Sequence, residues 1–80
     1  MKYIVIGAGG IGSTVALDLA QCSETNSVSV ADINMTAAQE VAQSLGSKGT
    51  ACKVDIYDAQ GLVNAIEGHD VVLNLAGPYY

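Results

Sequence analysis

The sequence predicts an α/β fold with one parallel sheet, because short apolar segments alternate with segments of helical periodicity along all 80 residues. A glycine-rich turn follows the first apolar segment, which is typical of a strand that leads directly into a helix. The last segment is apolar at nearly every position, as expected for a parallel strand covered on both faces. Right-handed crossovers then favour the strand order 3-2-1-4, with the third helix on the opposite face from the first two.

The first half of the chain contains two expected strands and two expected helices. Residues 2–7 form the first strand, and residues 28–32 form the second. The first helix is expected from Gly10 to Cys22, with an apolar stripe of Ile11, Val15, Leu19 and Cys22. Asn34 or Thr36 begins the second helix; Thr36 followed by Gln39 fits a capping box, and Gly46 ends the helix.

The second half contains a polar strand, a short helix and an apolar strand. Residues 50–55 form the third strand, which we place at the sheet edge, where Lys48 and Lys53 discourage pairing with other chains. Asp58 caps the third helix, and residues 70–76 form the fourth strand. A helix of about three turns cannot cover four strands. We therefore expect a missing second half of a larger doubly wound domain, or a second copy of the chain, to cover the exposed face and the open fourth strand.

Composition and charge limit the possible partners. The net charge is −5, with three lysines against eight acidic residues, so no basic patch is available for nucleic acid or an anionic membrane. Cys22 and Cys52 are expected to be buried thiols in a reducing, cytoplasmic environment. Glycines interrupt the apolar N-terminal stretch, which argues against a signal peptide, and no segment approaches the roughly 20 apolar residues of a membrane span.

The segment Gly7-Ala8-Gly9-Gly10-Ile11-Gly12 has the pattern G-x-G-x-x-G between a strand and a helix. In this pattern the first glycine permits a tight turn, the second allows a diphosphate to approach the backbone, and the third lets the helix lie close to the strand. The helix then presents free N–H groups and a positive dipole end to phosphate. We expect dinucleotide contacts from Gly7, Gly9, Gly10, Ile11 and Gly12.

Asp32 ends the second apolar segment, 20 residues after Gly12. An acidic residue at this spacing binds the adenosine ribose hydroxyls in NAD-binding folds. Its carboxylate would repel a 2′-phosphate, and Ile33 and Asn34 offer no cation, so the sequence favours NAD over NADP. The alternative for Asp32 is a helix N-cap or a solvated turn.

Two further segments lie at the carboxyl ends of expected strands, where ligands bind in open α/β sheets. Asp55 is placed beside the adenine ring, where it can accept a hydrogen bond from the exocyclic amine while Ile56 packs on the base. The alternative, that Asp55 only terminates the strand, stays open. The turn at Ala76, Gly77 and Pro78 has room for ribose or nicotinamide, or is an ordinary strand-to-helix turn.

No catalytic or metal site is evident. The single histidine, His69, is expected in a solvated loop away from the ligand, and Tyr79 and Tyr80 are candidate pocket walls or core residues. No acid–base pair for a substrate is visible, so this segment is not expected to be catalytic alone. We assign residues 1–80 to the N-terminal portion of a dinucleotide-binding, Rossmann-type domain.

Four segments together resemble the N-terminal NAD(P)-binding domain of the saccharopine dehydrogenase-like family. They are residues 4–12, 30–33, 54–56 and 71–78, and the Ala76-Gly77-Pro78 ending with Tyr79 is the most specific part. The resemblance implies oxidoreduction at a C–N bond of an amino acid or polyamine, by an enzyme whose substrate domain follows this segment.

Two other interpretations remain at this stage. Nucleotide-sensing regulatory modules of potassium transport systems also begin with a strand, this glycine pattern and a strand-terminal acid, but they lack the Ala-Gly-Pro ending. Short-chain dehydrogenases resemble the segment Asn74-x-Ala76-Gly77, although their glycine spacing is wider and no Tyr-x-x-x-Lys follows.

Overall fold

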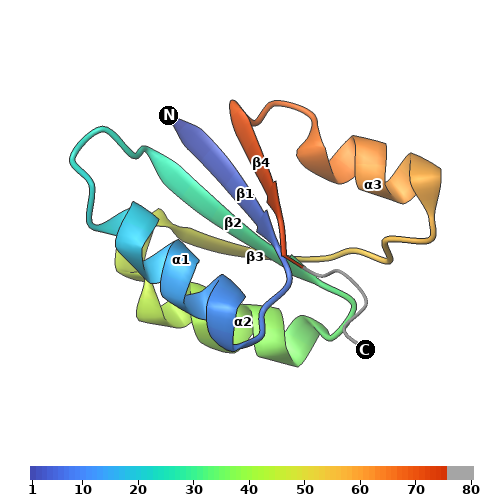
Figure 1. Cartoon of the computed structure of the whole chain (residues 1–80), viewed down its shortest axis with the longest axis horizontal. Coiled ribbons are helices and arrows are strands. Elements are labelled where there is room, and N and C mark those ends of the chain that lie inside the picture. Colours follow the sequence, from blue (N-terminus) through green and yellow to red (C-terminus); the bar gives the residue numbers. More distant parts are fainter. Residues whose placement is uncertain (76–80) are drawn as a thin grey trace.

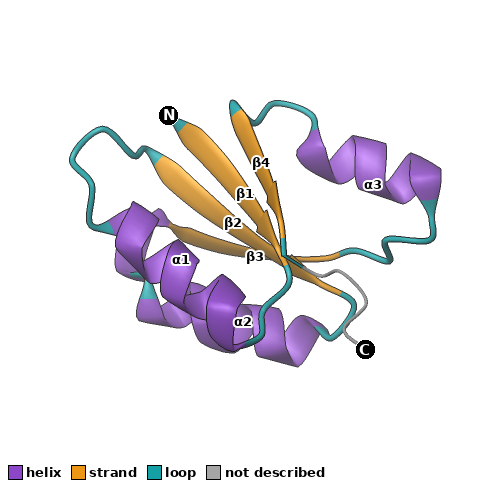
Figure 2. Ribbon diagram, viewed as in Figure 1, coloured by secondary structure: helices purple, strands orange, loops and turns teal. Residues whose placement is uncertain are grey.

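The computed structural model describes residues 1–75, which form one sheet with helices on both faces (Figures 1 and 2). The elements, in chain order, are β1 Lys2–Ile6, α1 Gly10–Ala20, β2 Ser27–Asp32, α2 Met35–Ser44, the 3-10 turn η1 Gly46–Lys48, β3 Gly49–Lys53, α3 Ala59–Ile66 and β4 Val71–Asn74. The four strands are parallel and lie in the order β3-β2-β1-β4. The predicted fold class and strand order are therefore confirmed.

The register of the sheet separates two apolar faces. Val5 of β1 aligns with Val30 of β2 and Leu73 of β4, and these side chains face α1 and α2. Ile4 and Ile6 alternate with Val5 and belong to the cluster on the opposite face. Because β1 is central and apolar on both faces, its carboxyl end is held rigidly where the glycine turn begins.

Helix α1 packs on the sheet mainly through small residues, and of the expected apolar stripe Leu19 packs against the core. Gly12 and Ala16 are its buried positions, whereas Ile11 is 66% exposed. The helix ends at Ala20, so Cys22 lies beyond it and is exposed, contrary to expectation. Glycine and alanine at this spacing bring the helix axis close to the sheet, and this turns Ile11 outward.

Asn34, not Thr36, caps α2. The Asn34 side chain accepts a hydrogen bond from the Ala37 N–H at 3.2 Å, and Thr36 lies inside the helix. The predicted capping box at Thr36 is therefore wrong. Asn34 comes two residues after β2 ends, so the cap fixes the short connection between Asp32 and α2.

Among residues 1–75, α3 is the one helix that covers the opposite face of the sheet (Figure 1). Asp58 caps this helix as predicted, since its carboxylate accepts a hydrogen bond from the Gly61 N–H at 3.1 Å. No residue of α3 is fully buried, and Val63 of the helix and Val72 of β4 remain 54% and 42% exposed. The expectation that one short helix leaves this face thinly covered is confirmed for the described residues.

Both outer strands are shorter than expected at their carboxyl ends. Strand β3 lies at the sheet edge as predicted but ends at Lys53, so Val54 and Asp55 follow the strand. Strand β4 ends at Asn74, and Ala76, Gly77 and Pro78 lie outside the described residues. Their expected role near the cofactor therefore stays a prediction, as do those of Tyr79 and Tyr80.

Candidate dinucleotide site

The turn between β1 and α1 depends on a glycine at its first position. Gly7 has a φ of 112°, a conformation that side-chain-bearing residues rarely adopt, and its N–H donates to the Ala31 carbonyl at 2.7 Å. This bond continues the β1–β2 ladder before the chain turns away. The turn then delivers the chain to α1, whose N-cap is Gly9.

No side chain of residues 1–75 caps the N-terminus of α1. The first-turn N–H groups of a helix have no partner within the helix, so they need an acceptor from elsewhere. Apart from the adjoining backbone, no atom of residues 1–75 lies within 4 Å of the position that a Cβ on Gly9 or Gly10 would occupy. This open backbone at a positive helix end is suited to an anionic phosphate.

Gly12 has the opposite environment. A Cβ on Gly12 would lie 1.9 Å from the Gly7 carbonyl oxygen and 2.9 Å from its carbonyl carbon. Only a hydrogen atom fits there, so α1 can lie directly against the turn that follows β1. The three glycines thus meet different demands of one compact loop: a positive φ, an open approach and close packing.

Asp32 connects the glycine turn to the beginning of α2. Its Oδ2 accepts a hydrogen bond from the Ala8 N–H at 2.8 Å, and its Oδ1 accepts one from the Asn34 N–H at 2.9 Å. Each carboxylate oxygen can accept more than one hydrogen bond, so capacity remains for hydroxyl groups of a ligand. The bond to Asn34 closes an Asx turn, in which an aspartate side chain accepts the N–H two residues later. Sequence reasoning missed the bond to Ala8, because the two residues are 24 positions apart.

The segment after β3 forms the third part of the site. Val54 is buried and its N–H donates to the Asp32 carbonyl at 3.0 Å, which places Asp55 just beyond Asp32 at the sheet edge. The exposed Asp55 accepts the Tyr57 N–H through Oδ1 at 2.9 Å. Ile56 is half-buried against the apolar cluster under α3, so only part of it faces the site.

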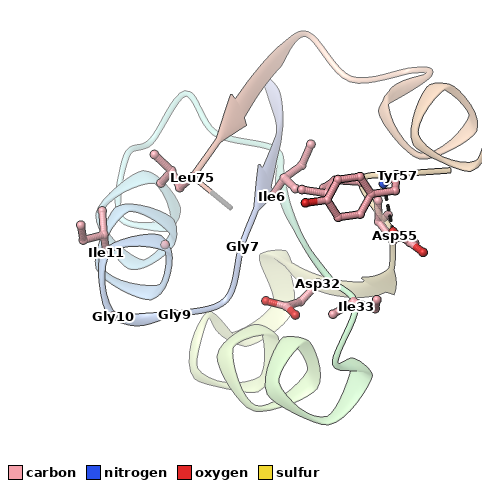
Figure 3. A pocket seen from close by; sticks show the side chains of 13 residues that line it. Ile6, Gly7, Gly9, Gly10, Ile11, Asp32, Ile33, Asp55, Tyr57 and Leu75 are labelled. Atoms are coloured by element: carbon pink, nitrogen blue, oxygen red, sulfur yellow. Dashed lines mark hydrogen bonds between the residues drawn. The ribbon is translucent and has the colours of Figure 1, made fainter. Parts of the chain in front are cut away.

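These segments enclose a pocket of about 650 Å³, within the usual size range of a cofactor site. In Figure 3, Ile11 and Leu75 lie on one side of it, Ile33 and Tyr57 on the other, and Asp32 between them. Every expected cofactor residue within residues 1–75 lines the pocket: Gly7, Gly9, Gly10, Ile11, Gly12, Asp32, Ile33, Asp55 and Ile56. Ile6, Val54, Tyr57 and Leu75 complete the lining and were missed from the sequence.

His69 lies at the other end of the sheet and is not solvated as expected. Its Nε2 is 2.9 Å from the Ser29 Oγ, and its Nδ1 is 3.3 Å from the Ile66 carbonyl oxygen. The ring is half-buried and ties the loop before β4 to strand β2. Its distance from the pocket leaves it a structural role.

Within residues 1–75, no group of three or more His, Cys, Asp or Glu side chains could hold a metal ion. A search of the same residues finds no helix with the length and apolar character to cross a membrane. The described site offers open backbone amides at the N-terminus of α1 and the Asp32 carboxylate in one pocket, groups that suit an anionic ligand with hydroxyl groups.

Comparison with known proteins shows the family to which the chain belongs. Residues 3–80 match the family model described as the saccharopine dehydrogenase NADP binding domain. The chain belongs to this family. The chain is thus a nicotinamide dinucleotide-binding domain of an oxidoreductase family, and the match agrees with the resemblance inferred from the glycine turn and the strand ends rather than with the sensor or short-chain dehydrogenase interpretations.

Two relatives show how much of a family member the chain represents. It is 28% identical over 81 residues to carboxyaminopropylagmatine dehydrogenase from Synechocystis sp. (strain ATCC 27184 / PCC 6803 / Kazusa), a match that covers 98% of this chain and 20% of that protein. It superposes with a TM-score of 0.81 and 26% identity on apo histidine-tagged saccharopine dehydrogenase (L-Glu forming) from Saccharomyces cerevisiae, covering 95% of this chain and 16% of that one. The chain therefore spans about a fifth or less of each relative.

Proposed function

We propose that residues 1–80 are the N-terminal portion of the dinucleotide-binding domain of a dehydrogenase, and that the cofactor is NAD(H). The observation that carries the proposal is the uncapped N-terminus of α1, which opens into the same pocket as the Asp32 carboxylate. The residues fit the group: the open backbone at Gly9 and Gly10 admits a diphosphate, and the carboxylate suits a ribose diol. Bound there, the dinucleotide would supply hydride transfer.

Asp32 supports NAD over NADP as the cofactor. A carboxylate held by two backbone N–H groups stays at the ribose position and repels a 2′-phosphate. The next two residues, Ile33 and Asn34, provide no cation to neutralise that phosphate. The family description names NADP, so the relative affinity for NAD and NADP is the measurement that tests this assignment.

The remaining contacts follow the order of strands along the sheet. Asp55, after the outer strand β3, is proposed to accept a hydrogen bond from the adenine amine, with Ile56 beside the base. Its Oδ1 already accepts the Tyr57 N–H, and we propose that Oδ2 accepts the amine hydrogen. Ala76, Gly77 and Pro78, which follow β4 on the other side of β1, are proposed near the nicotinamide ribose.

The reaction proposed for the whole protein is oxidoreduction at a C–N bond of an amino acid or polyamine. Both relatives are dehydrogenases whose names refer to amino-acid or polyamine-like compounds. Their greater length supports a separate substrate domain that provides the catalytic residues and covers the exposed face of the sheet. A second copy of the chain is the other candidate cover, and we expect the protein in the cytoplasm.

Calorimetric titration of NAD and NADP into the protein expressed from its whole reading frame tests the proposal. NAD should bind more tightly than NADP. Replacing Asp32 with Asn keeps one oxygen that can accept a backbone N–H but removes the negative charge. The affinity for NAD should therefore fall by about 10-fold or more, and the difference in affinity between NAD and NADP should shrink. The matched control Glu40→Gln, an exposed acid on α2, should bind as the unmodified protein does.

Tighter binding of NADP would overturn the cofactor assignment. Failure of both dinucleotides to bind would overturn the proposed function itself.

A further inference from the structure

Tyr57 stands out because the described part of the chain covers very little of its side chain. Its side chain is 87% exposed, the largest exposed fraction among the exposed large hydrophobic side chains of residues 1–75. It nevertheless lines the pocket, and Figure 3 shows its ring beside Asp55 and directed toward the pocket rather than away from it. An aromatic ring in such a position has both faces available to a ligand.

The backbone that carries this ring is fixed. The Tyr57 N–H donates to Asp55 Oδ1 at 2.9 Å, and the Asp58 N–H donates to the Asp55 carbonyl oxygen at 2.9 Å. Asp58 in turn caps α3 through the Gly61 N–H. The turn is therefore organised before any ligand binds, and only the side-chain torsions of Tyr57 remain to be restricted.

A second exposed apolar side chain faces the same part of the pocket. Ile33 is 59% exposed and follows β2, the strand that pairs with β3. Ile33 and Tyr57 therefore come from the ends of neighbouring strands and line one pocket that also contains Asp32 and Asp55. A planar apolar group that can also donate to a carboxylate is the ligand chemistry that this arrangement suits.

The strand order decides which end of the dinucleotide reaches Tyr57. Along the sheet edge, Tyr57 follows β3, Asp32 ends β2, the glycine turn follows β1, and β4 lies beyond. With the ribose at Asp32 and the diphosphate at the glycine turn, the base attached to that ribose is adenine, and the nicotinamide lies on the β4 side. We propose that Tyr57 stacks on the adenine base, opposite Ile33; this inference rests on the proposed function.

The test compares ligands that contain adenine with one that lacks it. NAD, ADP-ribose and nicotinamide mononucleotide are titrated into the protein from its whole reading frame and into its Tyr57→Ala and Tyr57→Phe variants. Tyr57→Ala should weaken NAD and ADP-ribose by about 5- to 150-fold, the range seen for base–aromatic stacking. Tyr57→Phe retains the ring and should stay near the unmodified affinity, and nicotinamide mononucleotide should be unaffected.

Two controls separate stacking from other effects. Val63→Ala removes another exposed apolar side chain, on α3, and should leave NAD affinity unchanged. The adenine H2 and H8 proton resonances should move upfield on binding to the unmodified protein and to Tyr57→Phe, but not on binding to Tyr57→Ala.

NAD affinity of Tyr57→Ala within twofold of the unmodified protein would overturn the stacking role and leave the proposed function standing. If the unmodified protein binds neither NAD nor ADP-ribose, the proposed function is wrong and this inference with it.

Discussion

At the scale of single residues, Gly12 has the least spatial freedom in the site. A side chain there would meet the Gly7 carbonyl oxygen at 1.9 Å, and both atoms belong to backbone that the sheet and helix hold in place. We expect Gly12→Ala to lower the free energy of unfolding by about 3 kcal/mol, measured by urea denaturation. Gly10→Ala, with nothing within 4 Å, should change it by less than about 1 kcal/mol. Equal stability of the two variants would contradict the close packing.

The two thiols are predicted to differ in reactivity. Cys22 is exposed, whereas Cys52 is half-buried on β3, and burial raises the pKa of the Cys52 thiol. The thiolate is the form that reacts, and a raised pKa leaves less of it at pH 8. Iodoacetamide should therefore label Cys22 before Cys52, and raising the pH should increase Cys52 labelling. Mass spectrometry of timed samples checks this, and faster labelling of Cys52 would refute it.

At the scale of elements, the beginning of α2 depends on one side chain. The Asn34 cap satisfies an N–H of the first turn, whereas the Thr36 side chain lies on the helix surface. Asn34→Ala should lower the free energy of unfolding by about 1 kcal/mol. Thr36→Ala should change it by less than about 0.5 kcal/mol. Thermal denaturation of both variants decides between them, since a capping box at Thr36 would reverse the order.

Lys48 caps the C-terminal end of α1. Its Nζ donates to the carbonyl oxygens of Ala20 and Cys22, at 3.1 and 3.0 Å, just where α1 ends. Lys48→Met keeps the length of the side chain but removes both charge-assisted bonds, and should lower the free energy of unfolding by about 2 kcal/mol. Lys53→Met is the matched control, because Lys53 is an exposed lysine at the other end of β3. Equal denaturation midpoints would mean that Lys48 does not stabilise the end of α1.

The features that the sequence predicted well follow from residue patterns at fixed spacings or from general rules of chain connection. The glycine turn and Asp32 were predictable because positive φ, close helix packing and strand-end acids each require particular residues at particular spacings. The strand order followed from the handedness of crossovers. The predicted helix boundaries at Cys22 and Thr36 were wrong because local sequence patterns do not decide where a helix begins or ends in the packed structure.

What the sequence missed depends on distant contacts. Ser29 and His69 are 40 residues apart, and Lys48 lies 26 residues beyond Cys22, so no local pattern links them. Ile11 was expected both in the apolar stripe of the first helix and at the cofactor site; Gly12 and Ala16 let α1 approach the sheet, so Ile11 lines the pocket and only its place in the stripe was wrong. Tyr57 follows a strand that ends earlier than expected, and its exposure became evident only from the path of the chain after β3.

At the scale of the whole molecule, the two faces of the sheet are unequally covered. Helices α1 and α2 pack on one face, while α3 covers the other with no fully buried residue (Figure 2). The strands whose ends contribute to the pocket all belong to one four-stranded sheet. The sheet therefore positions the residues that are proposed to bind the cofactor. The exposed face and β4 are the surfaces proposed to contact the remainder of the domain.

The central claim is that the N-terminus of α1 binds a diphosphate while Asp32 binds the adjoining ribose. A crystal structure with NAD tests it most directly. We expect the diphosphate within hydrogen-bond distance of the backbone N–H groups of residues 9–12, and the adenosine ribose hydroxyls on the Asp32 carboxylate. A dinucleotide bound elsewhere, or a glycine turn closed against the diphosphate, would contradict the account.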